Sequence, residues 1–113
     1  MSALASGPPI ISRAKLVDYL LSFHHPRGRS KARFFASAGY YSANWRRLQG
    51  DILKALDTAE PATLTLSAYG AKYVVPLELI GPLGRRLRIT SVWIKGAADP
   101  RPRFVTATPR RLP

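Results

Sequence analysis

The chain has 113 residues, which allows one domain with a single modest core. It contains no cysteine, so disulfides, thiolate zinc sites and cysteine nucleophiles are excluded. Two histidines and six acidic residues are too few and too scattered to form a metal site, so we expect no metal and no cofactor. No apolar run approaches the roughly 20 residues of a membrane-spanning helix, and the N-terminus lacks the basic segment of a signal peptide. We therefore expect a cytoplasmic protein.

The net charge points to the kind of partner. Eighteen lysines and arginines against six acidic residues give +12. Most of these cations are arginine, whose planar guanidinium group suits phosphate oxygens. We therefore expect the protein to bind RNA. A basic surface that serves only solubility, and an acidic protein partner, remain as alternatives.

Residues 11–109 are predicted to form one domain, between a flexible arm (residues 1–10) and a basic tail (residues 110–113). The first helix is expected over residues 12–24, with Ser12 as its cap and an end before Pro26. Its apolar face is expected to contain Leu16, Leu20 and Phe23.

Two more helices are predicted before residue 60. The second covers residues 30–38, with Ser30 as its cap and Gly39 as its stop. The third runs from residue 42 to about residue 56. The residues expected to face the core are Phe34, Phe35, Ala38, Trp45, Leu48, Ile52 and Leu56.

After residue 61 the apolar period changes from 3.6 to 2, which predicts strands over residues 64–68, 73–79, 86–95 and 103–108. Pro76 predicts an edge strand or a bulge. The apolar face of the third strand changes near Val92, which predicts a bulge or a strand covered on both faces. The order of elements indicates an α+β fold, with three N-terminal helices packed on a four-stranded antiparallel meander.

The segment at residues 24–33 contains both histidines and four cations, and it leads into a helix N-terminus, where free backbone N–H groups favour anions. Pro26 biases the backbone of His25 to an extended form that projects its side chain from the preceding helix. An exposed loop histidine or a helix cap is the alternative. The cations of this segment are predicted to bind phosphate, or to form a solvated basic face: Arg27, Arg29, Lys31 and Arg33.

Further cations and tyrosines lie at the start of the third strand and at the first hairpin turn: Arg85, Arg86, Arg88, Tyr69, Lys72 and Tyr73. By alternation Arg86, Arg88 and Thr90 share one face of the strand. The tyrosines offer faces for base stacking, or serve as half-buried packing.

The signatures of common enzyme classes are absent: there is no GK[ST] phosphate loop, no G-x-S-x-G elbow, no H-E-x-x-H motif and no pair of carboxylates. The remaining residue types suit metal-free cleavage of RNA, in which the 2′-hydroxyl is the nucleophile and the protein supplies an acid, a base and cations. We predict that His25, as general acid or base, and Lys31 enclose the scissile phosphate. Arg88 with Thr90 or Thr106 would complete this site from the sheet.

Several motifs resemble a family of small uncharacterised bacterial proteins that also occur as tail domains of polymorphic toxins. They are K-L-x-x-Y-L-L (15–21), H-P-x-G-x-x-K-A-x-F-F (25–35), G-Y (39–40), Y-G-x-K-Y (69–73), G-P-x-G-R (81–85), V-W-I (92–94) and P-R-x-V-T-A (102–107). The layout is similar to that of the metal-free ribonuclease toxins of barnase, EndoU, colicin and RelE type. The resemblance thus implies a toxin that a small acidic antitoxin neutralises.

The polar motif residues that the resemblance carries over are His25, Lys31, Lys72, Tyr73, Arg85 and Thr106. The family commonly ends its last strand with T-A-Y-P, whereas this chain has T-A-T-P at residues 106–109. The catalytic candidates are therefore His25, Lys31, Tyr73, Arg88, Thr90 and Thr106. The candidates for RNA binding are Arg27, Arg29, Arg33, Lys72, Arg85 and Arg86. A non-catalytic nucleic-acid-binding module and a basic interaction protein are the alternative functions.

Overall fold

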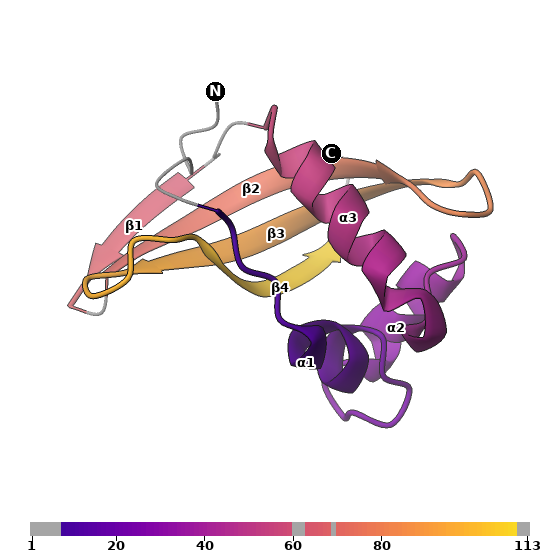
Figure 1. Cartoon of the computed structure of the whole chain (residues 1–113). Helices are drawn as coiled ribbons and strands as arrows, with labels where there is room; N and C mark the ends of the chain where they lie inside the picture. Colours follow the sequence, from indigo (N-terminus) through magenta and orange to yellow (C-terminus); the bar gives the residue numbers. More distant parts are fainter. Residues whose placement is uncertain (1–7, 60–62, 69, 111–113) are drawn as a thin grey trace.

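The computed structural model describes residues 8–59, 63–68 and 70–110 (Figure 1). Three helices pack on one face of a four-stranded antiparallel sheet, so the predicted α+β fold is confirmed. The strand order is β1-β2-β3-β4, in which each strand pairs with the next one along the chain, as predicted for a meander. Most of the predicted arm (residues 1–7), Tyr69 of the first turn and residues 111–113 of the tail lie outside the described residues.

The first helix is shorter than predicted. It consists of α1 (Arg13–Lys15) and a π-helical turn, η1 (Leu16–Leu20). Ser12 caps it as predicted, since its hydroxyl accepts the N–H of Lys15 at 3.2 Å. The helix ends at Leu20 instead of residue 24 because the hydroxyl of Ser22 accepts the next backbone N–H groups, those of His24 and His25. Phe23, predicted to be buried, is therefore 45% exposed.

The second and third helices are α2 (Arg29–Ala36) and α3 (Trp45–Leu56), the latter preceded by a 3-10 turn, η2 (Ser42–Asn44). Gly39 follows α2 with a φ of +95°, which confirms its role as the stop. The prediction that Ser30 caps α2 is wrong, because Gly28 occupies the cap position and makes no side-chain bond. The buried face of α3 is formed by Leu48, Ile52 and Leu56 as predicted, and this helix packs against β2.

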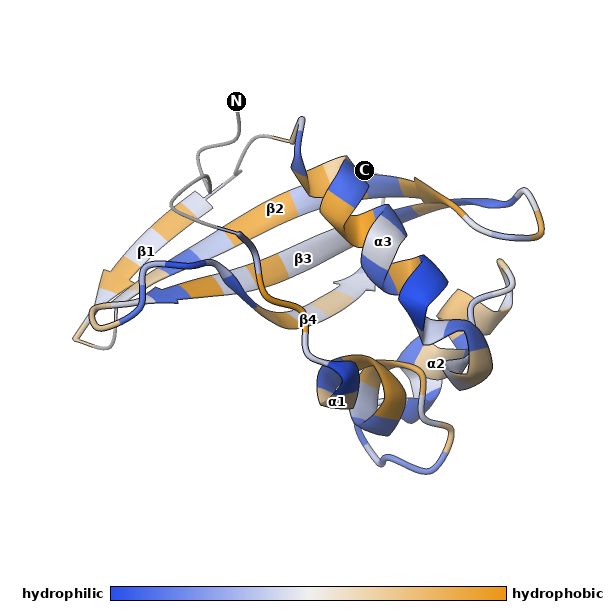
Figure 2. Ribbon diagram, in the orientation of Figure 1, coloured by the Kyte–Doolittle hydropathy of each residue, from blue (hydrophilic) through white to orange (hydrophobic). Residues whose placement is uncertain are grey.

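The sheet contains β1 (Thr63–Ser67), β2 (Gly70–Ile80), β3 (Arg86–Gly96) and β4 (Arg103–Pro109). Among the described residues, pairing of β1 with β2 ends at Val74. Pro76 lies beyond that pairing, and on its other side it pairs with Thr90 of β3. Figure 2 shows apolar and polar residues alternating along β2 and β3.

The irregular apolar pattern of β3 comes from one polar residue in its core-facing row. This row is regular, but it contains the fully buried Ser91. The hydroxyl of Ser91 donates to the carbonyl of Val75 at 2.7 Å and accepts the indole N–H of Trp93 at 2.9 Å. The pairing of β3 with β4 does shift register between Val92 and Trp93, but the extra residue is Val105 on β4, and β3 pairs with β2 without a shift. The irregularity therefore belongs to β4 and does not change the faces of β3, where the sequence predicted it.

The core lies between the helices and the sheet, and its largest fully buried side chains are Trp93, Tyr40, Phe35, Phe104, Leu16, Leu20, Leu48, Ile52, Leu56, Leu87 and Ile89. The opposite face of the sheet is free of helices in the described part of the chain (Figure 1). Among the described residues, none of the helices is long and apolar enough to cross a membrane.

Candidate functional site

Three polar side chains meet around Tyr19, which lies in η1: two from the segment that follows it and one from β4. The hydroxyl of Tyr19 is 3.0 Å from the hydroxyl of Thr106 on β4. The ring of His25 packs edge-on against the Tyr19 ring, with centroids 5.0 Å apart. The ammonium group of Lys31 on α2 lies 5.5 Å from the centroid of the same ring. We call these four residues, Tyr19, His25, Lys31 and Thr106, the tyrosine cluster.

His25 holds the turn that starts α2. Its Nδ1 atom accepts the backbone N–H groups of Arg27 at 3.0 Å and of Gly28 at 3.1 Å. Its carbonyl accepts the N–H of Arg29 at 2.9 Å. These N–H groups are therefore not free to receive an anion, contrary to the expectation from the sequence. Because Nδ1 is an acceptor, the neutral ring carries its proton on Nε2.

Gly28 brings this turn close to Tyr19. A Cβ atom at Gly28 would collide with the backbone carbonyl of Tyr19, so only glycine allows this approach. The ammonium group of Lys31 donates to the carbonyl of Arg27 at 3.2 Å. Backbone contacts thus fix the positions of His25 and Lys31 relative to the phenol.

The environment of Tyr19 changes its acidity. Partial burial acts to raise its pKa, but the hydrogen bond of the phenol to Thr106, together with the nearby ammonium groups of Lys31 and Lys15, outweighs burial. The pKa of Tyr19 therefore lies below its ordinary value of 10.0. A phenol that ionises more readily is a better base near neutral pH.

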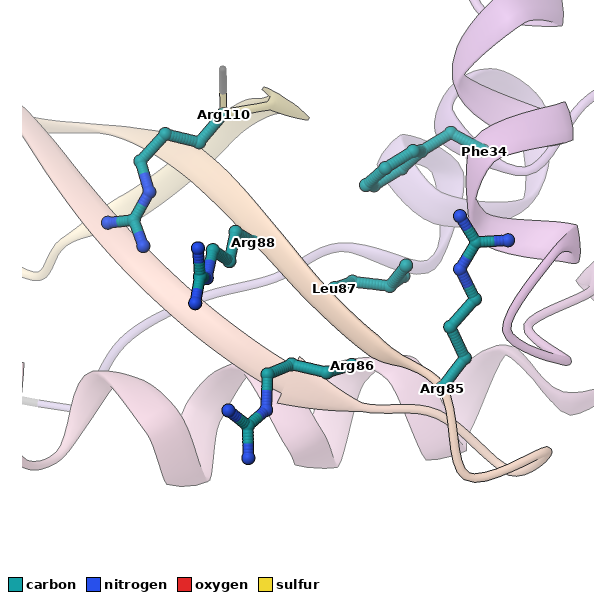
Figure 3. A pocket seen from close by; sticks show the side chains of 6 residues that line it. All are labelled: Phe34, Arg85, Arg86, Leu87, Arg88 and Arg110. Carbon is teal, nitrogen blue, oxygen red and sulfur yellow. The ribbon is translucent and has the colours of Figure 1, made fainter. Parts of the chain in front are cut away.

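A second group of residues surrounds an open hollow of about 290 Å³, beside the point where β3 begins (Figure 3). We call it the arginine hollow. Phe34 of α2 and Leu87 of β3 project into it from opposite sides. Its full lining is Phe34, Arg85, Arg86, Leu87, Arg88 and Arg110. The hollow exists because β4 stops short of the start of β3: their pairing begins at Ile89, and only the N–H of Arg110 reaches the carbonyl of Arg88, at 2.9 Å.

Positive charge is concentrated at the arginine hollow. Arg86 forms an ion pair with Glu78 at 2.9 Å. Within the described ranges, Arg85, Arg88 and Arg110 make no ion pair. Like charges held together repel one another, and an anion placed among them would relieve that repulsion.

The predicted sheet residues Arg88, Thr90 and Thr106 share the face that the helices leave open. Thr90 pairs with Thr108, and Thr106 pairs with Val92. Since paired residues project on the same side of a sheet, Thr106, Thr108 and Arg110 follow one another along β4 on that face. The sheet thus connects the tyrosine cluster with the arginine hollow.

Tyr73 and Lys72 lie away from both groups. Tyr73 pairs with Trp93, whereas Arg88 pairs with Glu78, five residues further along β2, or about 17 Å in an extended strand. The ring of Tyr73 faces the core side and lies 4.9 Å from the ammonium group of Lys95. Lys72 is exposed. Neither residue is brought together with the tyrosine cluster.

The remaining predicted cations, Arg27, Arg29 and Arg33, are exposed on α2 and the turn before it, as their role in RNA binding requires. Within residues 8–59, 63–68 and 70–110, there is no group of three or more side chains able to ligate a metal ion.

Four residues of these two groups were not predicted as site residues from the sequence: Tyr19, Phe34, Leu87 and Arg110. Tyr19 and Phe34 fall on the apolar faces of predicted helices, and this pattern favours packing residues. Their positions within the motifs at residues 15–21 and 25–35 are the signal that could have identified them. Arg110 was assigned to a basic tail, and only its backbone bond to Arg88 reveals its place.

Comparison with known proteins identifies the family. A family model described as "Domain of unknown function (DUF6883)" matches residues 8–111, so the chain belongs to this family. A chain in the solved structure of a contact-dependent growth inhibition toxin–immunity protein complex from Klebsiella pneumoniae 342 has a similar fold, with a TM-score of 0.72. The two chains are 17% identical, and the match covers 89% of this chain and 99% of the other. No curated protein matches the sequence.

Proposed function

We propose that this member of the DUF6883 family is a toxin domain that cleaves RNA without a metal ion, by attack of the 2′-hydroxyl. The observation that carries the proposal is the tyrosine cluster, in which a phenol of lowered pKa, an imidazole, an ammonium group and a hydroxyl meet. The net charge of +12 supports a polyanionic substrate. The similarity in fold to a chain of a toxin–immunity protein complex is consistent with a toxin.

The geometry favours Tyr19 as the base. Its phenolate takes the proton of the 2′-hydroxyl while the 2′-oxygen forms a bond to phosphorus and the bond to the 5′-oxygen breaks. Solvent water protonates the departing 5′-oxygen, and the hydroxide so formed returns Tyr19 to the phenolate. The products are a 2′,3′-cyclic phosphate and a free 5′-hydroxyl.

His25 and Lys31 stabilise charge in this scheme. With Nδ1 occupied by two backbone N–H groups, the neutral His25 ring can donate from Nε2 to a phosphate oxygen. In this proposal His25 is a hydrogen-bond donor, and Tyr19 takes the role of base that the sequence analysis offered to His25. The ammonium group of Lys31 offsets the negative charge that develops at phosphorus.

Cleavage of RNA by purified protein in the presence of EDTA tests this proposal. Wild-type protein should cut, and Tyr19→Phe, which keeps the ring but removes the hydroxyl, should lose activity by about a hundredfold or more. Tyr41→Phe is the matched control, because the Tyr41 side chain is exposed and outside the cluster. An active Tyr19→Phe variant would rule out Tyr19 as the base.

An acidic immunity or antitoxin protein is the partner we propose. The basic surface would speed its association and make it sensitive to salt. Action in the cytoplasm belongs to the same proposal, since that is where its RNA substrates are found. If the protein binds RNA but neither cuts it nor harms cells that express it, the non-catalytic binding module replaces the ribonuclease.

A further inference from the structure

We propose that the arginine hollow binds a phosphate of the substrate strand a few nucleotides away from the phosphate that is cut. This inference rests on the proposed ribonuclease function and names a second contact of the same substrate. It assigns a role to Phe34 and Arg110, which the proposed chemistry at the tyrosine cluster does not use.

The first argument is charge. Four guanidinium groups border an open hollow of about 290 Å³, and Glu78 is the acidic partner of one of them, Arg86. Arg88 and Arg110 are held next to each other by their backbone bond of 2.9 Å. Figure 3 shows both side chains on the same side of the hollow, with Arg85 on the other side of Phe34 and Leu87. Guanidinium groups in such an arrangement can bind the oxygens of one phosphate from more than one direction.

The second argument is the distance between the hollow and the tyrosine cluster. Thr106 of the cluster and Arg110 of the hollow are four residues apart on β4, or about 13 Å along an extended strand. Thr108 lies between them on the same face and pairs with Thr90. Hydroxyl groups of this kind are common partners of phosphate oxygens. A nucleic-acid strand can therefore run along β4 from one group to the other.

The third argument is the helix that borders both groups. Lys31 and Phe34 are three residues apart on α2, so they lie on neighbouring positions of one helix face. Lys31 reaches the ring of Tyr19, and Phe34 lines the hollow. The edge of the Phe34 ring provides an apolar surface beside the arginines, against which a base can pack. An acidic protein could neutralise the same charge. However, α2 connects the hollow with the tyrosine cluster, which favours the RNA strand that the cluster would cut as the ligand of the hollow.

Binding of short oligonucleotides that cannot be cleaved tests the inference. The probes are oligoribonucleotides with every 2′-hydroxyl methylated, from the dinucleotide to the hexanucleotide, measured by fluorescence anisotropy. For wild-type protein the affinity should rise sharply at the length that reaches the hollow. The variant Arg88→Ala/Arg110→Ala should lose this rise, by about tenfold for each arginine, and should bind the dinucleotide as wild type does.

The control is Arg46→Ala/Lys54→Ala, which removes the same charge from the exposed side of α3. It should weaken binding by a similar factor at every length. This factor should be smaller than the loss that Arg88→Ala/Arg110→Ala shows for the longer probes. Unfolding midpoints of all proteins establish that the variants are folded. If Arg88→Ala/Arg110→Ala binds the hexanucleotide as tightly as wild type, or binds probes of every length more weakly by the same factor, the inference is wrong. This holds whether or not the variant also loses the ability to bind an acidic protein partner.

Cleavage of the unmethylated hexanucleotide separates this inference from the proposed function. If wild-type protein cuts this hexanucleotide and Arg88→Ala/Arg110→Ala loses affinity equally for probes of every length, the ribonuclease proposal stands and the second phosphate site is overturned. If wild-type protein does not cut the hexanucleotide, the ribonuclease proposal fails. A loss of affinity in Arg88→Ala/Arg110→Ala that grows with probe length would still identify the hollow as a phosphate site.

Discussion

Tyr19 owes its chemical character to contacts from one distant strand and from the segment that follows it. Thr106 is 87 residues away in sequence, and His25 and Lys31 reach the ring from the turn and the helix that follow it. The π-helical turn η1 carries Tyr19, and such turns are frequent at functional sites. Sequence patterns could identify His25, Lys31 and Thr106 as polar motif residues. The motif at residues 15–21 contains Tyr19 but does not reveal its role, because the environment of the phenol is created only when β4 and η1 come together.

Titration of the tyrosines provides a prediction at this scale. Hydrogen bonding and nearby lysines lower the pKa of Tyr19 below 10.0 despite partial burial. By contrast, burial and the neighbouring Asp51 raise the pKa of Tyr40. The difference between the ultraviolet pH titrations of wild type and Tyr19→Phe should therefore show a phenol that ionises at a lower pH than an ordinary tyrosine.

The same shift has a defined effect on stability. Because the folded pKa of Tyr19 lies below the unfolded value, its contribution to the free energy of unfolding is fully present above pH 10.0 and is lost as pH falls through the folded pKa. For cleavage, the rate should rise with pH until the phenol is ionised. A difference titration with its midpoint at or above 10.0 would contradict this account of Tyr19.

At the scale of elements, the periodicity of the sequence predicted three helices and four strands, and most of them have one face against the core. The exception is β1, whose residues are all exposed although its apolar alternation predicted the strand. The errors are at helix ends, where local side chains compete for backbone groups. Ser22 captures the N–H groups that would have extended the first helix. His25, and not Ser30, provides the acceptor at the start of α2. Propensity rules favour serine as a cap, and the contact of Gly28 with Tyr19 that places His25 there is not visible in the sequence.

The two roles of His25 can be separated by substitution. His25→Asn keeps an acceptor at the position of Nδ1, so the turn before α2 should retain its stability. His25→Ala removes that acceptor and should lower the free energy of unfolding by about 1 kcal/mol. Both variants lack the Nε2 donor, and both should cut RNA much more slowly. Denaturant unfolding and cleavage rates measure the two effects, and full activity of His25→Asn would show that His25 only supports the turn.

For the whole molecule, net charge is the property that the sequence established most simply, and the fold gathers part of it into two groups of cations. The exposed arginines of α2 and the turn before it flank the tyrosine cluster, and the arginine hollow lies further along the sheet. The sequence predicted the cations of both groups except Arg110. It could not predict that Tyr73 and Lys72 lie at the other end of the sheet from Arg88, because this depends on strand register.

Salt dependence of RNA binding tests the electrostatic part of the account. Affinity should fall steeply as salt concentration rises, by a slope of about 0.7 for each phosphate contact with a single strand. The variant Arg27→Ala/Arg29→Ala/Arg33→Ala should reduce this slope by about 2 and weaken binding equally for different RNA sequences. A slope near zero for wild-type protein would mean that its charge serves solubility alone.

The central claim is that the tyrosine cluster cleaves RNA through the 2′-hydroxyl. Its most direct test compares two oligonucleotides that are identical except for a methyl group on the 2′-oxygen at the cleaved position, both in EDTA. We predict that wild-type protein cuts the unmodified strand to a 2′,3′-cyclic phosphate, leaves the methylated strand intact, and loses the activity on Tyr19→Phe substitution. Equal cleavage of the two strands, or none of either strand, would contradict the claim.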